Sequence, residues 1–350
     1  MKKIVLLVLL LSLFFSCQKE GKIENVERAF YYWKGNSLGQ ENHSQIEKLK
    51  VKKLYVKLFE VDYSETRGNF PYEKNRPSVY DFKELDSVEV VPTIFIKNGI
   101  FQYNDEKSLD KLADNIVFLI NKYSSSVDYS GKKEQIFTYN EIQIDCDWTK
   151  STKDRYFYLL KKIKALSQKE LSCTLRLYPY KYQDIMGIPP VDKATLMCYN
   201  LIKPLSQKDK NSILDIDELK KYLNQKKSYP LHLDIALPTF YWTQLYQNNR
   251  FMELINLSTN EVKSFAKNVK PLWYQVEKDT SINYQTYLKL GDQLKCEDVS
   301  VSTIQEAISI IKKNVSFDKN TTISLFDLDS STFKQYSNEE ISSFYDAFTK

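Results

Sequence analysis

The chain has 350 residues, which is long for an average domain but lies within the range that a single α/β barrel occupies. Its 50 basic and 45 acidic side chains give a formal net charge of +5 without a dense basic tract, which argues against nucleic acid as a partner. Only two histidines occur, His43 and His232, and neither has the spacing of metal ligands or of a Ser-His-Asp triad. We therefore expect neither a metal ion nor a cofactor.

The first 16 residues have the pattern of an export signal. A short basic start at 1–3 precedes an apolar run at 4–15, which is too short and wrongly flanked for a transmembrane helix. Ser16 and Cys17 follow this run directly, and a small residue before a cysteine resembles the lipobox of bacterial lipoproteins. The resemblance implies that Cys17 becomes the lipidated first residue of the mature protein. The alternative is an ordinary signal peptide with an incidental cysteine.

Residues 17–27 then form a tether, and 18–20 resemble the short acidic tag of surface lipoproteins in Bacteroidota. We expect an outer-membrane lipoprotein of a bacterial cell envelope, attached to the membrane through Cys17 and facing either the cell surface, as the tag indicates, or the periplasm. The other four cysteines include three in apolar, strand-like runs, where buried free thiols are the commoner state.

Eight β-rich runs alternate with amphipathic helical segments from residue 28 to the end of the chain. The strands are expected at 28–33, 52–61, 88–96, 141–148, 171–178, 194–200, 231–238 and 322–329. The principal helices are expected at 108–123, 152–167, 215–225, 300–313 and 337–348. This alternation predicts a parallel sheet with right-handed crossovers, closed as a single-domain (β/α)8 barrel of the TIM type. The alternative is an open doubly wound sheet, but no Gly-rich phosphate loop follows the first strand.

One region departs from the alternation, near 239–296. It contains short aromatic strands and turns, with 247–249 as a hairpin tip. Because this region follows the seventh strand, we expect a small β insertion over the barrel mouth that acts as a lid or as a wall of the binding site.

In barrel enzymes the chemistry takes place at the C-terminal ends of the strands. The polar and aromatic residues expected near this end are Trp33, Glu60, Gln143, Asp145, Asp147, Arg176, Tyr199, Asn200, Asp234, Trp242 and Asp327. Carboxylates ringed by aromatic side chains suit a glycan, because glycoside hydrolysis uses two acids and because rings stack on sugar faces. We therefore expect a glycan or oligosaccharide as the partner.

The fourth strand, EIQIDCDW, alternates isoleucines with polar residues. Period-two geometry puts Gln143, Asp145 and Asp147 on one face, with the two acids about 6–7 Å apart along the strand. Asp145 would lie deeper and orient or protonate Asp147 at the mouth. The structural alternative is that Arg176 or Lys57 pairs with these acids.

QIDCDW on the fourth strand and LMCYN on the sixth resemble the family 18 glycoside hydrolases, the chitinase-like barrels. Together with ALPTFYW they resemble more closely an uncharacterised family of bacterial lipoproteins and secreted proteins regarded as glycosidase-like barrels. The family motif DxxDxDxE has two registers here, one with Thr149 and one, which we favour, with Asp147 at the position of the final Glu. In LMCYN, Tyr199 matches the family and Asn200 replaces an Asp. The resemblance implies substrate-assisted cleavage.

On these grounds Asp147, Asp145 and Tyr199 are the expected catalytic residues, and the other residues near the strand ends are expected to bind substrate. Three functions remain open. The chain is an exported glycoside hydrolase, a non-catalytic carbohydrate-binding lipoprotein on a degenerate glycosidase scaffold, or an assembly lipoprotein of the envelope. Fold alone does not decide among them, because barrels host many reactions.

Overall fold

The computed structural model describes residues 23–350, apart from 36, 83, 84, 86, 128, 129, 226 and 283–285. The expected signal at 1–16 and the lipidation site Cys17 lie outside the described residues. Within the described part of the chain, no helix combines the length and apolar character needed to cross a membrane.

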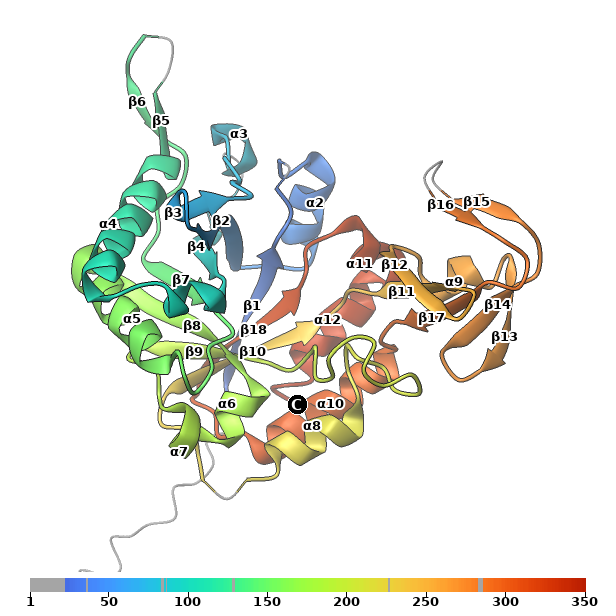
Figure 1. Cartoon of the computed structure of the whole chain (residues 1–350). Helices are drawn as coiled ribbons and strands as arrows, with labels where there is room; N and C mark the ends of the chain where they lie inside the picture. Colours follow the sequence, from blue (N-terminus) through green and yellow to red (C-terminus); the bar gives the residue numbers. More distant parts are fainter. Residues whose placement is uncertain are drawn as a thin grey trace, which may run out of the picture.

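Eight parallel strands form the expected closed barrel, in the order β1-β18-β10-β9-β8-β7-β4-β2. The strands are β1 (Asn25–Tyr32), β2 (Lys53–Ser64), β4 (Glu89–Ile96), β7 (Glu141–Asp145), β8 (Glu170–Arg176), β9 (Lys193–Met197), β10 (His232–Pro238) and β18 (Asn320–Phe326). The sheet closes because β1 pairs with β2 as well as with β18. The predicted (β/α)8 barrel is therefore confirmed, and the open doubly wound sheet is wrong (Figure 1).

Helices connect the strands on the outside of the barrel (Figure 1). They are α2 (Gln40–Lys48), α3 (Val79–Phe82), the 3-10 helix η1 (Asn98–Gln102), α4 (Glu106–Tyr123), α5 (Lys153–Ser167), α6 (Leu177–Lys181), α7 (Gln183–Met186), α8 (Ile216–Leu223), α10 (Val301–Asn314), α11 (Ser330–Gln335) and α12 (Asn338–Asp346). Several begin at side-chain caps that are visible in the sequence. Ser337 and Glu340 form a capping box at α12, and Asp105 caps α4.

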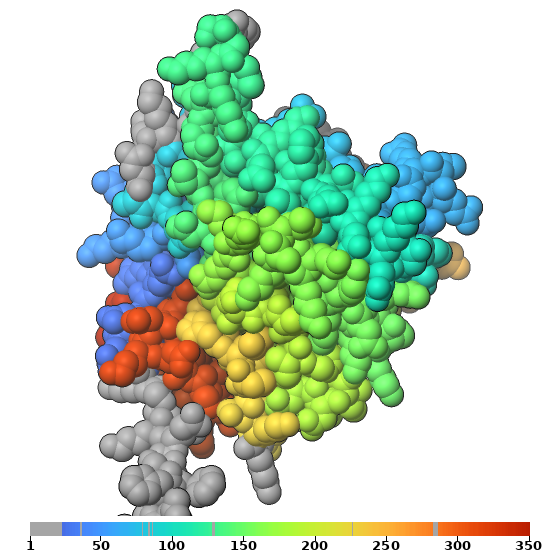
Figure 2. Space-filling model, turned by 90° about the vertical axis from the view of Figure 1, so that its left-hand side faces the viewer, coloured from blue at the N-terminus to red at the C-terminus, as the bar shows by residue number. Residues whose placement is uncertain are grey.

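Two features extend the barrel beyond the predicted pattern. Strand β2 continues past the barrel wall and turns back as the antiparallel strand β3 (Gly68–Tyr72). A hairpin of β5 (Ser125–Val127) and β6 (Lys133–Gln135) follows α4 and projects from the body of the molecule (Figures 1 and 2).

The insertion after β10 is a separate five-stranded antiparallel sheet in the order β12-β11-β17-β14-β13 (Figure 1). Its elements are β11 (Trp242–Gln247), β12 (Arg250–Ile255), α9 (Thr259–Val262), β13 (Ala266–Lys270), β14 (Trp273–Val276), the hairpin β15 (Thr280–Ile282) with β16 (Thr286–Leu288), and β17 (Gln293–Glu297). Asn248 and Asn249 join β11 to β12 with φ values of 50° and 61°. Asparagine tolerates this left-handed region, which explains the hairpin tip predicted there.

Charged side chains fill the N-terminal end of the barrel interior. The carboxylate of Glu141, a residue only 1% exposed, lies 2.7 Å from the ammonium of Lys193 and 3.5 Å from that of Lys53. The backbone N–H of Thr322 donates to Asp234 at 2.7 Å, and Lys193 lies 3.7 Å from the same carboxylate. Ionised groups are stable in such an interior because each has a partner of opposite charge.

The expected placement of Asp234 at the mouth is therefore wrong. Asp234 is the third residue of β10, pairs in register with Thr195 of β9, and is 1% exposed. His232 lies 3.2 Å from its carboxylate, which holds the pKa of the imidazole raised to about 9. Since β10 continues to Pro238, a glycan at the C-terminal end of the barrel does not reach Asp234.

The four described cysteines, Cys146, Cys173, Cys198 and Cys296, are free and buried, as the apolar runs around three of them predict. Burial raises the pKa of the Cys198 thiol, so the sulfur behaves as a small apolar group. The fold of the described residues is thus held by packing and by the charge pairs of the barrel interior.

Replacing Glu141 by Gln should lower the free energy of unfolding by about 3 kcal/mol, because two buried ammonium groups lose a shared counter-ion. Glu170→Gln is the matched control. Glu170 lies 3.3 Å from Lys193, but its side chain is 45% exposed, so the loss should stay below about 1 kcal/mol. Urea unfolding measures both values, and equal losses would contradict the role given to Glu141.

Candidate functional site

An open pocket of about 450 Å³ lies at the C-terminal ends of β7, β8 and β9, next to the start of the insertion. Its lining residues are Asp147, Trp148, Arg176, Leu177, Tyr178, Pro179, Met186, Tyr199, Asn200, Leu201, Ile202, Lys203, Pro204, Tyr222 and Trp242. Tyr178 is 47% exposed, and Tyr222 and Trp242 are partly exposed. The pocket therefore offers aromatic surface on several sides and charged groups at one edge.

Asp147 and Arg176 form a bidentate ion pair at this edge. The guanidinium donates from Nε to Oδ1 at 2.6 Å and from Nη2 to Oδ2 at 2.8 Å. The carboxylate side chain is 50% exposed and the arginine side chain 33%, so both groups remain accessible from the pocket. Arg176 is thus one of the two partners, with Lys57, that the structural alternative predicted for Asp145 and Asp147. The two hydrogen bonds fix the positions of both side chains.

Asp145 lies deeper than Asp147, as the alternation along EIQIDCDW predicts. It is 8% exposed and accepts a hydrogen bond from Thr174 Oγ1 at 2.6 Å. Burial raises the pKa of Asp145 to about 6, against the hydrogen bond from Thr174, and the negative charge of Asp147 adds to the increase. A carboxyl group with this pKa holds or releases a proton near neutral pH, which general acid–base chemistry requires.

Neither register of the family motif supplies an unpaired outer acid. In one register the position falls on Thr149, whose hydroxyl bonds to Ser151 and Thr152 at the start of α5. In the other it falls on Asp147, which Arg176 holds. Burial prepares the inner carboxyl group, Asp145, to hold a proton near neutral pH.

Tyr199 and Asn200 form the floor and wall of the pocket beyond β9. The ring of Tyr199 is 2% exposed and packs against Phe240 and Phe326, with centroids 5.9 and 5.4 Å apart. Burial raises the pKa of its hydroxyl, and the nearby charges of Tyr31 and Asp145 act in the same direction. Asn200 adopts a left-handed φ of 52°. Its buried Oδ1 accepts no hydrogen bond from the described residues.

Trp33, Glu60 and Asp327 lie on other strands of the mouth and do not line this pocket. Lys57 donates to Glu60 at 2.7 Å and lies 5.4 Å from the centroid of the Trp33 ring. Although burial raises the pKa of Glu60, hydrogen bonds from Lys57 and Tyr72 bring it below its ordinary value. Burial raises the pKa of Asp327 to about 6. The mouth thus contains a second carboxyl group that titrates near neutral pH.

Gln143 is part of the barrel core and not of the pocket. It is fully buried, accepts a hydrogen bond from the Tyr31 hydroxyl at 2.8 Å and donates one to Thr195 Oγ1 at 3.1 Å. The expectation that Gln143 meets a substrate is therefore wrong in this conformation, because its amide already bonds to neighbouring strands.

Several residues at or beside the pocket, Trp148 and Tyr178 among them, are not among those that the sequence predicts. Tyr222 reaches the pocket from α8, and Lys203 follows β9 on a loop. Glu297, the last residue of β17 in the insertion, accepts a hydrogen bond from the indole of Trp242. Their sequence neighbourhoods resemble ordinary helix, loop and strand, so only the tertiary contact identifies them.

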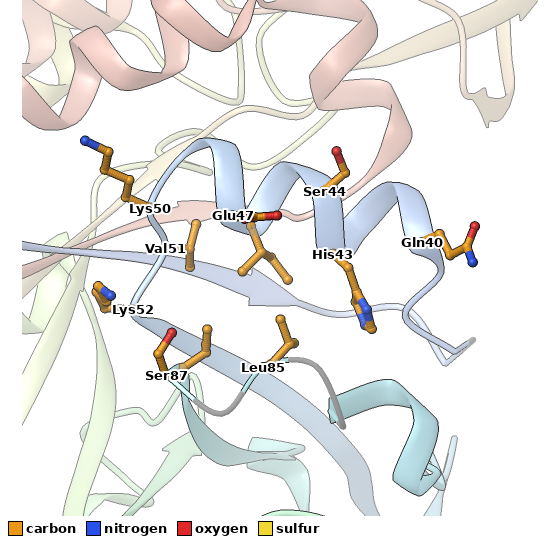
Figure 3. Close-up of a pocket in the computed structure, with 11 residues that line it drawn as sticks. Gln40, His43, Ser44, Glu47, Lys50, Val51, Lys52, Leu85 and Ser87 are labelled. Atoms are coloured by element: carbon orange, nitrogen blue, oxygen red, sulfur yellow. The ribbon is translucent and has the colours of Figure 1, made fainter.

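A larger hollow, of about 600 Å³, lies at the other end of the barrel strands (Figure 3). It lies between α2 and the segment with Leu85, Ser87 and Val88, and Lys52 and Val88 in its wall immediately precede β2 and β4. Among the described residues that line it, Glu47 is the one carboxylate, and no Tyr, Trp or Phe is present. The smaller pocket at the C-terminal ends is therefore the candidate site, because barrel chemistry occurs at that end.

Asp145→Asn should stabilise the protein at pH 7 by about 3 kcal/mol and change little at pH 4. The native carboxyl group binds its proton up to about pH 6, whereas the unfolded one releases it near pH 4, so stability falls as pH rises between these values. Asparagine avoids this loss and can still accept from Thr174. Urea unfolding from pH 4 to 7 measures the difference.

Asp114→Asn, on the exposed side of α4, is the matched control and should change stability little at any pH. An Asp145→Asn variant that is no more stable than the wild type at pH 7 would contradict the raised pKa.

No protein-family model matches the chain, and no curated protein matches it. Among solved structures, the chain is similar to the spore cortex-lytic enzyme SleL of Bacillus cereus, with 12% identity, a TM-score of 0.55 and coverage of 94% of this chain and 76% of that one. It is also similar to a chitinase from Bacteroides thetaiotaomicron, with 15% identity, a TM-score of 0.51 and coverage of 93% and 96%. At these identities the similarity establishes a shared (β/α)8 fold.

Proposed function

We propose that the chain binds a glycan in the pocket at the mouth of the barrel. The observation that carries the proposal is the convergence of partly exposed rings, Tyr178, Tyr222 and Trp242, around the bidentate pair of Asp147 and Arg176. Aromatic rings stack on the C–H faces of sugars, and charged groups bond to their hydroxyls.

The unpaired Oδ1 of Asn200 supports the same ligand class. A buried acceptor without a donor costs about 1–3 kcal/mol, and a ligand hydroxyl or N–H that reaches it recovers part of this cost. The shared fold with a chitinase, whose name denotes an enzyme that acts on a sugar polymer, also supports a sugar polymer as ligand.

Hydrolysis is the second candidate function, and Asp145 is the observation that favours it. Its pKa of about 6 lets it hold a proton behind Asp147, which is the carboxyl group that reaches the pocket. Cleavage with Asp147 as general acid requires that this proton reach Asp147 and that Arg176 release it. Because Arg176 bonds to both carboxylate oxygens of Asp147, binding without turnover is the function that the geometry favours.

The test uses the detergent-solubilised full chain and chitohexaose as the first glycan, in isothermal titration calorimetry. Tyr178→Ala should weaken binding about tenfold, because a stacking ring contributes about 1.4 kcal/mol. Phe118→Ala is the control, since Phe118 is 64% exposed on α4 and does not line the pocket. Failure of chitohexaose and of a wider glycan array to bind the wild type would overturn the proposal.

Product analysis of the same samples decides between the two candidate functions. Binding without released sugar is the expected result. Release that disappears in Asp147→Asn, with binding retained, would establish the hydrolase instead.

We also propose that residues 1–16 are an export signal and that Cys17 carries a lipid that holds the barrel to the cell envelope, on the outer membrane and facing the cell surface. The apolar run followed by Ser16 and Cys17 supports this proposal. In cells fed an alkyne-tagged fatty acid, the wild-type protein should carry the tag and sediment with membranes. Cys17→Ser should lose both properties, whereas Ser12→Ala should keep them. A tagged Cys17→Ser protein would contradict the assignment.

A further inference from the structure

The carboxylate of Glu297 joins the insertion to the barrel at the edge of the pocket. Glu297 is 1% exposed and accepts hydrogen bonds from Trp242 Nε1 at 2.5 Å and from Gln244 Nε2 at 2.9 Å. On the barrel side it accepts from the backbone N–H and the hydroxyl of Ser212, at 2.9 and 2.7 Å. Lys295 donates to Oε1 at 2.7 Å, the oxygen that also accepts from the Ser212 N–H, whereas Trp242, Gln244 and the Ser212 hydroxyl donate to Oε2.

Lys295 extends this joint to the loop after β9. The side chain of Lys295 is almost fully buried, and its ammonium donates to the carbonyl oxygens of Gln207 and Lys210 at 2.9 and 2.7 Å. The indole of Trp273 donates to the carbonyl of Lys208 at 2.7 Å. Because these acceptors are backbone atoms, the contacts fix the course of the loop whatever its side chains.

Both carboxylate oxygens of Glu297 and the ammonium group of Lys295 have hydrogen-bond partners, so neither buried charge is left unsatisfied. Burial raises the pKa of Glu297, but hydrogen bonds from Lys295, Ser212 and Trp242 bring it below its ordinary value, so the carboxylate is ionised. A satisfied buried network of this kind specifies one arrangement of the groups around it. Those groups include Trp242, which lines the pocket, and Ser212, whose carbonyl oxygen accepts from the backbone N–H of the pocket residue Ile202 at 3.4 Å.

We infer that Glu297 is a positioning residue of the glycan pocket: it fixes the indole of Trp242 and, through Ser212 and Lys295, the loop at 201–212, of which 201–204 line the pocket. The inference deepens the proposed function and rests on it. Glu297 itself does not line the pocket, so it acts through these two neighbours.

Two variants separate positioning from simple support of the fold. Glu297→Gln alone leaves the buried Lys295 ammonium without its counter-ion, so the double variant Glu297→Gln, Lys295→Met removes both charges at similar side-chain length. Ser212→Ala is the matched control, because it removes one donor to the same carboxylate without touching Trp242.

The first measurement is the NMR signal of the Trp242 indole N–H, one of four tryptophans in the chain, assigned by its absence in Trp242→Phe. The double variant should shift this signal, and Ser212→Ala should leave it near its wild-type position. An unchanged signal in the double variant would overturn the inference. This measurement needs no glycan, so it tests the inference even where the proposed function fails.

The second measurement is chitohexaose affinity. The double variant and Trp242→Phe should each weaken binding about tenfold, and combining them should add less than a further threefold, because Glu297 acts through Trp242. Affinity losses that multiply would show that the carboxylate does not act through the indole and would overturn the inference. A wild-type protein that binds no glycan would instead overturn the proposed function.

Discussion

The pairing of β1 with β2 closes the sheet, and the position of every group at the mouth depends on that closure. Eight strands that run in the same direction end on one rim, so segments far apart in the sequence meet there. Arg176 reaches Asp147 because β8 lies beside β7, and the residues after β9 complete the wall. Without that pairing β1 would separate from β2, and Trp33, which follows β1, would separate from Glu60 on β2.

The acidic side chains inside the barrel are paired differently at its two ends. At the N-terminal end, Glu141 and Asp234 are buried with lysines, and their pairing stabilises the barrel. At the mouth, Asp145 is buried and Asp327 partly buried with weaker compensation, so stability falls as pH rises from about 4 to about 6 and these groups ionise. These weakly compensated acids at the mouth lower the stability of the protein, and such a local cost is typical of a functional site.

The fold could be predicted from the sequence because each strand is a local run of β-forming residues and each helix has its own apolar period and caps. The depth of a residue along the barrel axis, by contrast, does not follow from its neighbours in the sequence. Asp234 and Gln143 lie on strands found in the correct places, yet their levels depend on partners such as Lys193 and Tyr31 from other strands. Such contacts leave no mark in either strand's own pattern. The sequence predicted Arg176 only as one of two possible partners of Asp147, the other being Lys57.

Trp242 and Glu297 are cross-strand neighbours at the first and last positions of the inserted sheet. The chain therefore leaves the barrel and returns to it at almost the same point, with the junction sealed by their hydrogen bond. Segments between these two residues can lengthen, shorten or change without altering the spacing of the barrel strands. Insertions and substitutions in this region can therefore change the rim of the barrel while the barrel strands stay constant.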